Sequence, residues 1–134
     1  IVLHSNHANE IDATVCDAAA RLRTAGATLL NQSVLLAGIN DSVAALHGLS
    51  LALWSAGALP YYLHLLDRVR GTAHFEVAES RARELMAGLA ALLPGYLVPR
   101  LAREVPGADA KRVLAPAAAM AAWDALHSDE TPGC

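Results

Sequence analysis

The sequence predicts an α/β fold built on parallel strands, and three observations lead to this prediction. Apolar segments of strand length alternate with amphipathic patterns of helical period. Strands are expected at residues 1–5, 29–38, 61–66 and, more weakly because it contains Pro99, 96–101. A polar residue recurs near the strand ends at intervals of about 30 residues, the length of one strand-plus-helix unit. Both an open doubly wound sheet and a (βα) barrel fit this order.

Three helices are expected between the strands, over residues 12–25, 41–56 and 80–93. Asp12 and Asp41 are suited to accept hydrogen bonds from the first turns of the first two helices, and Gly26 and Gly57 are suited to end them. In the third helix, Leu92 belongs to the apolar stripe and is expected to point inward. The helices are long enough to return the chain for a parallel strand, and in such folds functional residues gather at the carboxyl ends of the strands.

The composition describes a globular domain and argues against several kinds of partner. With 54% hydrophobic residues in 134, the chain has enough apolar surface to fold, and no apolar run approaches the ~18 residues of a membrane span. The net charge of −3 and the lack of a basic stripe argue against nucleic acid. Cys16 and Cys134 are too few for a disulfide framework, which favours a reducing, cytoplasmic location. The chain begins at Ile1, within a predicted buried strand, so we expect a fragment of a longer protein.

Polar residues follow the first predicted strand and interrupt the second. His4 and His7 come directly after the first strand, where they either bind a metal or simply end the strand, and no third ligand has a suitable spacing. Asn31, Gln32 and Ser33 interrupt an otherwise apolar strand, although parallel strands covered on both faces are usually apolar throughout. Either a polar network within the protein or a bound ligand must satisfy these groups, and we favour the ligand.

Two charged residues are further candidates for a site. Asp67 follows the third strand, where it either pairs with nearby arginines on the surface or binds a cationic group of a substrate. Lys111 is the single lysine among ten basic residues and lies in a loop of small residues. A lysine can form an imine with a carbonyl compound, which an arginine cannot do. Lys111 is therefore either a Schiff-base nucleophile or an ordinary surface lysine of an arginine-rich protein.

Several stretches of the sequence closely resemble the lysine 2,3-aminomutases, a family of radical S-adenosylmethionine enzymes. They read LNQSVLLAGIND, PYYLHLLD, GTAHF and GYLVP, at residues 30–41, 60–67, 71–75 and 95–99, and residues 106–111 continue the match. The resemblance extends from His4 to about Lys111. The HLLD form of the second stretch is most similar to the bacterial branch that supplies (R)-β-lysine for modification of elongation factor P. The chain resembles the carboxyl-terminal half of such an enzyme.

The resemblance implies a fold, cofactors and a reaction. The fold would be part of a (βα)6 radical S-adenosylmethionine barrel, with parallel strands and with helices on its outer face. S-adenosylmethionine, a 4Fe-4S cluster and pyridoxal phosphate would lie at the open mouth of this partial barrel. In the family, reductive cleavage of S-adenosylmethionine gives a 5′-deoxyadenosyl radical, and the amino group of L-lysine bound to pyridoxal phosphate then shifts to give β-lysine.

The resemblance also assigns roles to charged residues. Lys111 matches the lysine that binds pyridoxal phosphate covalently, as an imine. Asp67 matches a carboxylate that binds the ε-ammonium group of the substrate, and Glu104 stands where the family usually has an aspartate with the same task. Two carboxylates around one ammonium group make physical sense, because a buried cation needs paired counter-charges.

Four further residues would lie near S-adenosylmethionine. His4 and Gln32 match positions that contact this cofactor, and Asn6 and Asn31 lie beside them. These residues fall at or near the carboxyl ends of the first two predicted strands. That edge is where barrels of alternating strands and helices carry their active sites.

The sequence also departs from the family pattern. The signature Cys-x3-Cys-x2-Cys, which binds the cluster, is absent, so the cluster ligands are not expected in this chain. Ser42 stands where clostridial enzymes have a cysteine that binds structural zinc, so no zinc is expected either. Arg112 and Val113 replace the Thr-Pro that usually follows the lysine of the family.

We divide the chain into residues 1–104, a part of the barrel, and residues 105–134, the lysine loop and a terminal helical tail. Two other functions remain open. The chain could be a non-catalytic half-barrel that binds a ligand or self-associates through its unpaired edge. It could also be an aldolase-like barrel that uses Lys111 without a cluster, although the motif at residues 30–41 argues against this class. The isolated chain is expected to be inactive.

Overall fold

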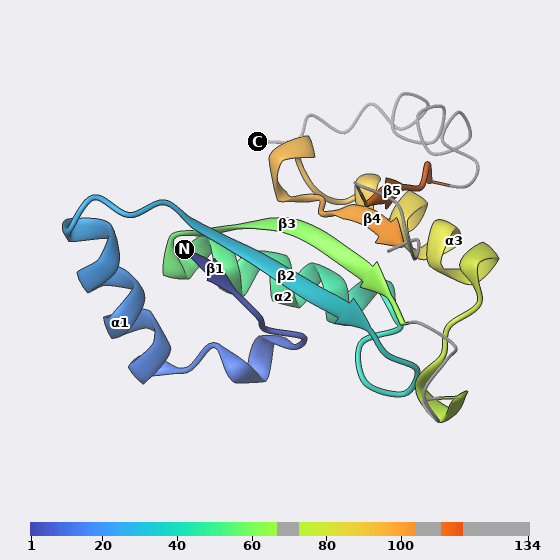
Figure 1. Ribbon diagram of the computed structural model, residues 1–134, viewed down its shortest axis with the longest axis horizontal. Helices are drawn as coiled ribbons and strands as arrows, with labels where there is room; N and C mark the ends of the chain where they lie inside the picture. The colour runs from blue at the N-terminus through green and yellow to red at the C-terminus, as the bar shows by residue number, and fades with distance from the viewer. Residues whose placement is uncertain (67–72, 104–110, 117–134) are drawn as a thin grey trace.

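The computed structural model describes residues 1–66, 73–103 and 111–116, in which strands and helices alternate (Figure 1). The strands are β1 (Val2–Leu3), β2 (Leu29–Leu35), β3 (Ala58–Leu65), β4 (Arg100–Arg103) and β5 (Arg112–Val113). The α-helices are α1 (Ala13–Thr24), α2 (Val43–Ala56) and α3 (Glu79–Ala90). Short 3-10 helices cover Ala8–Glu10, Ala73–Phe75 and Gly95–Leu97.

The five strands form one sheet in the order β1-β2-β3-β4-β5. The first four strands are parallel, and β5 runs antiparallel to β4. In a doubly wound sheet the strand order reverses at a switch point. The four parallel strands described here show no such reversal. Neighbouring helices contact one another, α1 with α2 and α2 with α3. The α/β prediction is therefore confirmed, and the arrangement is consistent with a partial (βα) barrel.

Two apolar clusters join the helices to one face of the sheet. The first brings α2 and α3 together with β2, β3 and β4, and it includes Leu35, Leu63 and Leu101. The second brings α1 and α2 together with the beginnings of β2 and β3, and it includes Leu29 and Ala58. Full burial of a leucine side chain contributes about 1.5–3 kcal/mol, so this packing holds the strands firmly in place. The same packing fixes the strands whose other side chains form the opposite face of the sheet.

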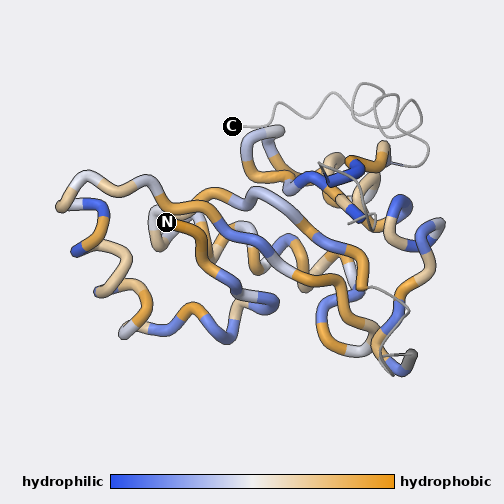
Figure 2. Tube along the Cα trace, viewed as in Figure 1, coloured by the Kyte–Doolittle hydropathy of each residue, from blue (hydrophilic) through white to orange (hydrophobic). Residues whose placement is uncertain are grey.

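That opposite face, called the inner face below, carries polar and aromatic side chains of β2 and β3. Along β2, alternate residues are buried against the helices, and the residues between them, which include Gln32 and Val34, are half-buried on the inner face. Figure 2 shows hydrophilic residues in the middle of β2, where Gln32 stands between the buried Asn31 and Ser33. On β3, Tyr62 and His64 are half-buried in the same way. A strand face with this composition is suited to bind polar ligands.

The first helix begins and ends as the sequence predicts. The Asp12 Oδ1 accepts a hydrogen bond of 2.9 Å from the Val15 N–H in the first turn of α1. Gly26, just after the end of the helix, has a φ of 94°, in the left-handed region that glycine adopts easily. Gly57 ends α2 in the same conformation, also as predicted.

The prediction that Asp41 caps the start of α2 is wrong, because the next residue, Ser42, is the cap. The Ser42 Oγ accepts the capping hydrogen bond of 3.1 Å from the Ala45 N–H. Asp41 instead accepts a hydrogen bond of 2.9 Å from the Gly38 N–H, which closes the turn before the helix. Aspartate and serine both cap helices well. Ser42 is the cap here because the Asp41 carboxylate is used in the turn that precedes the helix.

The third helix and the fourth strand also differ from the prediction. Gly95–Leu97 is a 3-10 helix, and β4 begins only at Arg100, after Pro99, which has no backbone N–H to donate to a sheet. The helix α3 ends at Ala90 and does not continue to residue 93. Leu92 is therefore 60% exposed, contrary to the prediction, and Leu93 is buried in its place.

The two outer strands differ from the prediction as well. The first strand covers only Val2–Leu3, and Ile1 and Val2 are 58% and 41% exposed, because β1 is the edge strand of the described sheet. The strand β5 was not predicted, and it lies directly after the loop that was expected to end at Lys111. The predicted helical tail beyond residue 116 lies outside the described residues.

Candidate active site

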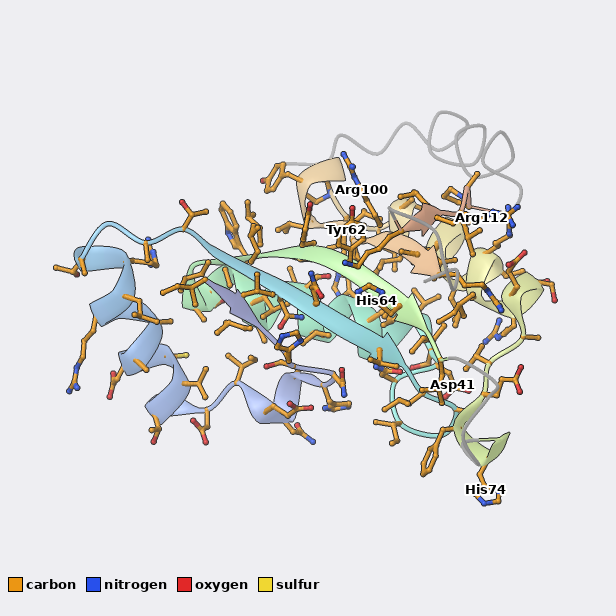
Figure 3. The ribbon with its side chains drawn as sticks, in the orientation of Figure 1. Asp41, Tyr62, His64, His74, Arg100 and Arg112 are labelled. Carbon is orange, nitrogen blue, oxygen red and sulfur yellow. The ribbon has the colours of Figure 1, made fainter. Side chains whose placement is uncertain are left out.

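Four side chains, called the inner-face cluster below, form a row of contacts across the sheet: Gln32 on β2, Tyr62 and His64 on β3, and Lys111 just before β5. The His64 Nε2 lies 3.4 Å from the Gln32 Oε1. The ring centroids of Tyr62 and His64 are 5.6 Å apart, and Figure 3 labels both residues on β3. The Lys111 Nζ lies 5.2 Å from the centroid of the Tyr62 ring.

A bulge in β3 turns two members of this cluster to the inner face. The register between β2 and β3 shifts between Asn31 and Gln32, because Tyr61 is an extra residue in β3. After the bulge, Tyr62 and His64 lie on the same side as Gln32, and the alternate residues of β3 are buried against the helices. Bulges are frequent beside active sites because they re-aim side chains in this way.

The antiparallel strand β5 brings Lys111 to the carboxyl ends of the parallel strands. Arg112 pairs with Arg103, which is the last residue of β4. The Leu114 N–H donates a hydrogen bond of 2.8 Å to the Leu101 carbonyl oxygen. The position of Lys111 is thus fixed relative to β4 by backbone pairing. In parallel α/β folds the carboxyl edge of the strands is where active sites lie.

The Lys111 ammonium group contacts an aromatic ring and takes part in no ion pair among the described residues. A cation over the face of a tyrosine ring gains about 0.5–2 kcal/mol, depending on how far the pair is removed from water. Lys111 itself is half-buried. Its amine is therefore directed to the inner face, and no carboxylate of the described residues holds it, an arrangement that suits a nucleophile.

The neighbouring phenol of Tyr61 stays protonated at neutral pH. The centroids of the Tyr61 and Tyr62 rings are only 4.2 Å apart. The Tyr62 side chain, chiefly through a hydrogen bond, raises the pKa of Tyr61, and the positive charge of Arg100 lowers this pKa in part. The ordinary pKa of tyrosine is about 10, so the raised pKa keeps the Tyr61 phenol neutral at pH 7.

A second group, the asparagine network, consists of Asn6, Asn31 and Asn40 and holds the turn after β1 against β2. The Asn31 Oδ1 accepts a hydrogen bond of 2.9 Å from the Ser5 N–H, and its Nδ2 donates one of 3.0 Å to the Ser5 carbonyl oxygen. The Asn6 Oδ1 accepts a hydrogen bond of 2.9 Å from the Val34 N–H. The turn after β1 is thereby attached to β2 at two points.

Asn40 completes the network and is only 1% exposed. Its Oδ1 accepts a hydrogen bond of 2.8 Å from the Leu36 N–H, and its Nδ2 donates to the carbonyl oxygens of Asn6 and Val34, each at 2.9 Å. The buried amides of Asn31 and Asn40 therefore find their partners inside the protein. The polar-network alternative accounts for Asn31 without a ligand.

The structure brings only some of the predicted site residues together. Gln32 and Lys111 belong to the inner-face cluster, whereas His4 is exposed at the end of β1. Contacts of S-adenosylmethionine with His4, Gln32 and the two asparagines stay predictions. The predicted substrate carboxylates, Asp67 and Glu104, lie outside the described residues.

Three residues of these groups were missed by sequence reasoning. Tyr62 and His64 occupy alternate positions of a strand, which is a signal for a common face, but the bulge at Tyr61 hides which face this is. Asn40 lies in the LNQSVLLAGIND motif, in a predicted loop, where an asparagine reads as an ordinary turn residue.

The described part of the chain holds no group of three or more His, Cys, Asp or Glu side chains that could bind a metal ion. None of the helices in these residues combines the length and the apolar character that crossing a membrane requires.

Comparison with known proteins finds relatives that share one name. No protein-family model matches the chain. The chain is 54% identical over 114 residues to the L-lysine 2,3-aminomutase of Escherichia coli (strain K12). These 114 residues are 85% of the chain and 33% of that protein. It is 48% identical to the protein of the same name from Haemophilus influenzae, over 86% of the chain and 34% of that protein. The L-lysine 2,3-aminomutase of Clostridium subterminale is 37% identical, over 84% of the chain and 27% of that protein. The chain thus spans about a third of the length of the curated relatives it matches, a smaller share than the expected half.

Proposed function

Because this chain is homologous to the L-lysine 2,3-aminomutases, we propose that it is a fragment of such an enzyme and carries the lysine that binds pyridoxal phosphate. The parent enzyme would convert L-lysine to β-lysine. The observation that supports this proposal most directly is the position of Lys111, the single lysine of the chain, on the inner face at the carboxyl edge of the sheet. An ordinary surface lysine has no reason to occupy this place.

The surroundings of Lys111 fit the covalent attachment of pyridoxal phosphate. The amine lies beside Tyr62 and close to the other members of the inner-face cluster. Pyridoxal phosphate, when bound, supplies a carbonyl that reacts with amines and a ring that delocalises electrons. The task of Lys111 would be to present its amine as the nucleophile and to withdraw when the amine of the substrate takes its place. Residues 105–134 would form the segment that carries this lysine, next to the part of the barrel formed by residues 1–104.

Recognition of the substrate is assigned to two carboxylates. Asp67 and Glu104 follow β3 and β4 in the sequence, and we infer that they bind the ε-ammonium group of L-lysine. A charge-assisted hydrogen bond is worth about 1.5–3 kcal/mol, so two such carboxylates would select a diamino acid over a monoamino acid. The glutamate reaches one methylene further than the aspartate that the family usually has there.

The other cofactor contacts are assigned to the first two strands. Gln32, oriented by His64 at 3.4 Å, and His4 would contact S-adenosylmethionine. Asn6 and Asn31 would act beside them through the hydrogen bonds that place the turn after β1. The ligands of the 4Fe-4S cluster would come from the rest of the parent enzyme. On the same resemblance we propose a cytoplasmic enzyme whose (R)-β-lysine serves the modification of elongation factor P.

The test of this function is the Lys111→Ala variant of the complete parent enzyme. We expect borohydride reduction of the wild-type enzyme to fix pyridoxal phosphate on the peptide that contains Lys111, as seen by mass spectrometry. The variant should bind no cofactor covalently, and its production of β-lysine should fall below detection, because no other lysine of this chain can replace Lys111.

Arg112→Ala is the matched control, because Arg112 is the next residue, is exposed and carries the same charge. This variant should keep both the covalent cofactor and the production of β-lysine. Cofactor found on another lysine of the parent enzyme, or full activity of Lys111→Ala, would contradict the proposed function.

One observation favours a second function for the chain alone. Ile1 and Val2 are exposed on the edge strand β1, where the sheet can pair with a strand of another molecule. The isolated chain could therefore act as a non-catalytic half-barrel that self-associates.

A further inference from the structure

The contact between Lys111 and Tyr62 joins two segments that backbone pairing alone would not bring into contact. Lys111 precedes β5, which pairs only with β4, whereas Tyr62 lies on β3, on the far side of β4. The lysine side chain nevertheless extends over the Tyr62 ring, with its Nζ 5.2 Å from the ring centroid. The direction of the amine is thus set by a side chain two strands away.

We propose that Tyr62 is the positioning residue of Lys111: its ring face attracts the ammonium group and directs the amine toward the inner face. In the parent enzyme, Tyr62 would guide Lys111 to pyridoxal phosphate, and this consequence rests on the proposed function. The ring suits this task better than a carboxylate, because it attracts the cation without accepting strong hydrogen bonds from it. The group is thus directed without a strong hydrogen bond, and it becomes a nucleophile when its ammonium form gives up a proton to water.

The Tyr62 ring is itself held firmly, which a positioning residue requires. Its backbone lies in a central strand, where it is paired with Gln32 on one side and with Arg100 on the other. The rings of Tyr61 and His64 contact it from both directions along β3, at centroid distances of 4.2 Å and 5.6 Å. A ring packed in this way has little freedom to turn away from the lysine.

The bulge in β3 is what makes this contact possible. The extra residue, Tyr61, shifts the alternation of β3, so that Tyr62 shares the inner face with His64. A regular strand would place the residue at this position on the side that the helices cover. The bulge thereby presents the ring to Lys111.

The test uses the fact that the chain has a single lysine. Reductive methylation of the 134-residue chain with ¹³C-formaldehyde gives one dimethyl-lysine signal besides that of the amino terminus, and dimethylation preserves the positive charge. Methyl protons above an aromatic ring resonate upfield of their position in an unfolded chain. We expect such an upfield position in the wild-type chain and in Tyr62→Phe, which keeps the ring.

Removal of the ring should abolish this effect. In Tyr62→Leu we expect the dimethyl-lysine signal to move to its position in the unfolded chain, whereas Tyr96→Leu should leave it unchanged. Tyr96 is a suitable control because it is an exposed tyrosine that contacts Trp54 and not the lysine. If Tyr62→Leu loses the dispersed amide spectrum of a folded chain, Tyr62→Met provides an unbranched replacement. An unchanged lysine signal in a folded variant without the ring would overturn the proposal.

A second measurement on the complete parent enzyme separates this proposal from the proposed function. Tyr62→Leu should slow the attachment of pyridoxal phosphate roughly three- to thirtyfold, the rate change that corresponds to a typical cation–π interaction, and Tyr62→Phe should restore it. A normal attachment rate in Tyr62→Leu would contradict the positioning role. If the methyl signal responds to Tyr62 but Lys111 never binds the cofactor, the proposed function fails and the Tyr62–Lys111 contact stands.

Discussion

Asn40 shows how a single buried amide can fix two turns relative to each other. Its three hydrogen bonds connect the backbone of Asn6, after β1, with Val34 and Leu36 at the end of β2. A buried backbone group that loses its partner costs about 1–3 kcal/mol. The relative position of His4 and Gln32, two residues predicted to act together, therefore depends on a buried side chain outside the inner-face cluster.

We predict that Asn40→Ala lowers the free energy of unfolding by roughly 2–4 kcal/mol, because three partly buried backbone groups lose their partner, each at a cost near the low end of the range of about 1–3 kcal/mol. Urea denaturation followed by circular dichroism measures this change. Asn40→Asp should be destabilising as well, because a carboxylate can accept from the Leu36 N–H but cannot donate to the two carbonyl oxygens.

Asn9→Ala is the matched control for these variants. Asn9 is exposed in the 3-10 helix after β1, and surface substitutions change stability by no more than about 0.5 kcal/mol. Equal stability of Asn40→Ala and Asn9→Ala would mean that the asparagine network contributes nothing to the fold.

At the scale of elements, β1 is an unprotected edge of the described sheet. It has two residues, one neighbouring strand, and apolar side chains at Ile1 and Val2 that are 58% and 41% exposed. Natural edge strands usually carry a charge, a proline or a cover that prevents pairing with other molecules. None of the three residues from Ile1 to Leu3 is charged.

We therefore predict that the isolated chain self-associates and that Val2→Lys reduces this association. A lysine on the edge strand would have to be desolvated, or placed next to a second lysine, when two edges pair. Analytical ultracentrifugation over a range of concentrations should show dimers or larger species for the wild-type chain and a shift toward monomer for the variant.

Ala18→Lys provides the control, because it adds the same charge at an exposed position of α1, away from the edge. The prediction would be wrong if both lysine variants reduced association equally, since the effect would then come from net charge. A wild-type chain that stays monomeric at all concentrations would contradict it as well.

The elements with local signals could be predicted from the sequence. The alternation of strands and helices was confirmed, and α1 begins after Asp12 and ends before Gly26 because capping and the left-handed conformation depend on residues nearby in the chain. Gly57 ends α2 for the same reason. These features need no information about which strands become neighbours.

Features that depend on tertiary pairing could not be predicted. The bulge at Tyr61 exists only in the register of β3 against β2, and β5 exists only because Arg112 meets β4. The role of Asn40 likewise requires Asn6 to lie beside it, although the two are far apart in sequence. The candidate site could therefore be predicted only in part. Gln32 and Lys111 stand out in the sequence by their residue type, whereas Tyr62 and His64 share the inner face only because of the bulge.

At the scale of the whole molecule, the proposed function assigns to this chain one part of the active site of the parent enzyme. It spans about a third of the length of its curated relatives. Within the residues that the structure describes, no group of acidic, histidine or cysteine side chains could bind a metal ion. The sequence holds two cysteines, fewer than the three of the cluster signature.

We predict that the 134-residue chain alone produces no β-lysine from L-lysine, even after reconstitution with iron, sulfide, pyridoxal phosphate and S-adenosylmethionine in the presence of a chemical reductant. A cluster held by three cysteines cannot form on two, so an electron from the reductant has no route to S-adenosylmethionine. Chromatographic detection of β-lysine is the measurement, with the complete parent enzyme as the positive control. Turnover by the isolated chain would refute the assignment of the cluster to the rest of the parent.

The order of the strands in the sheet is also the order in which a ribosome releases them. Each of β2, β3 and β4 finds its partner strand already synthesised, and the connection to be closed is short, as for the Ser5–Asn31 pair, 26 residues apart. Loops of this length close at a modest entropic cost, so the sheet can grow by one strand at a time during translation. Only β5 reverses direction, and it can be added when β4 is in place. Lys111 is thus the last member of the inner-face cluster to reach its position, after the surface that receives it has formed.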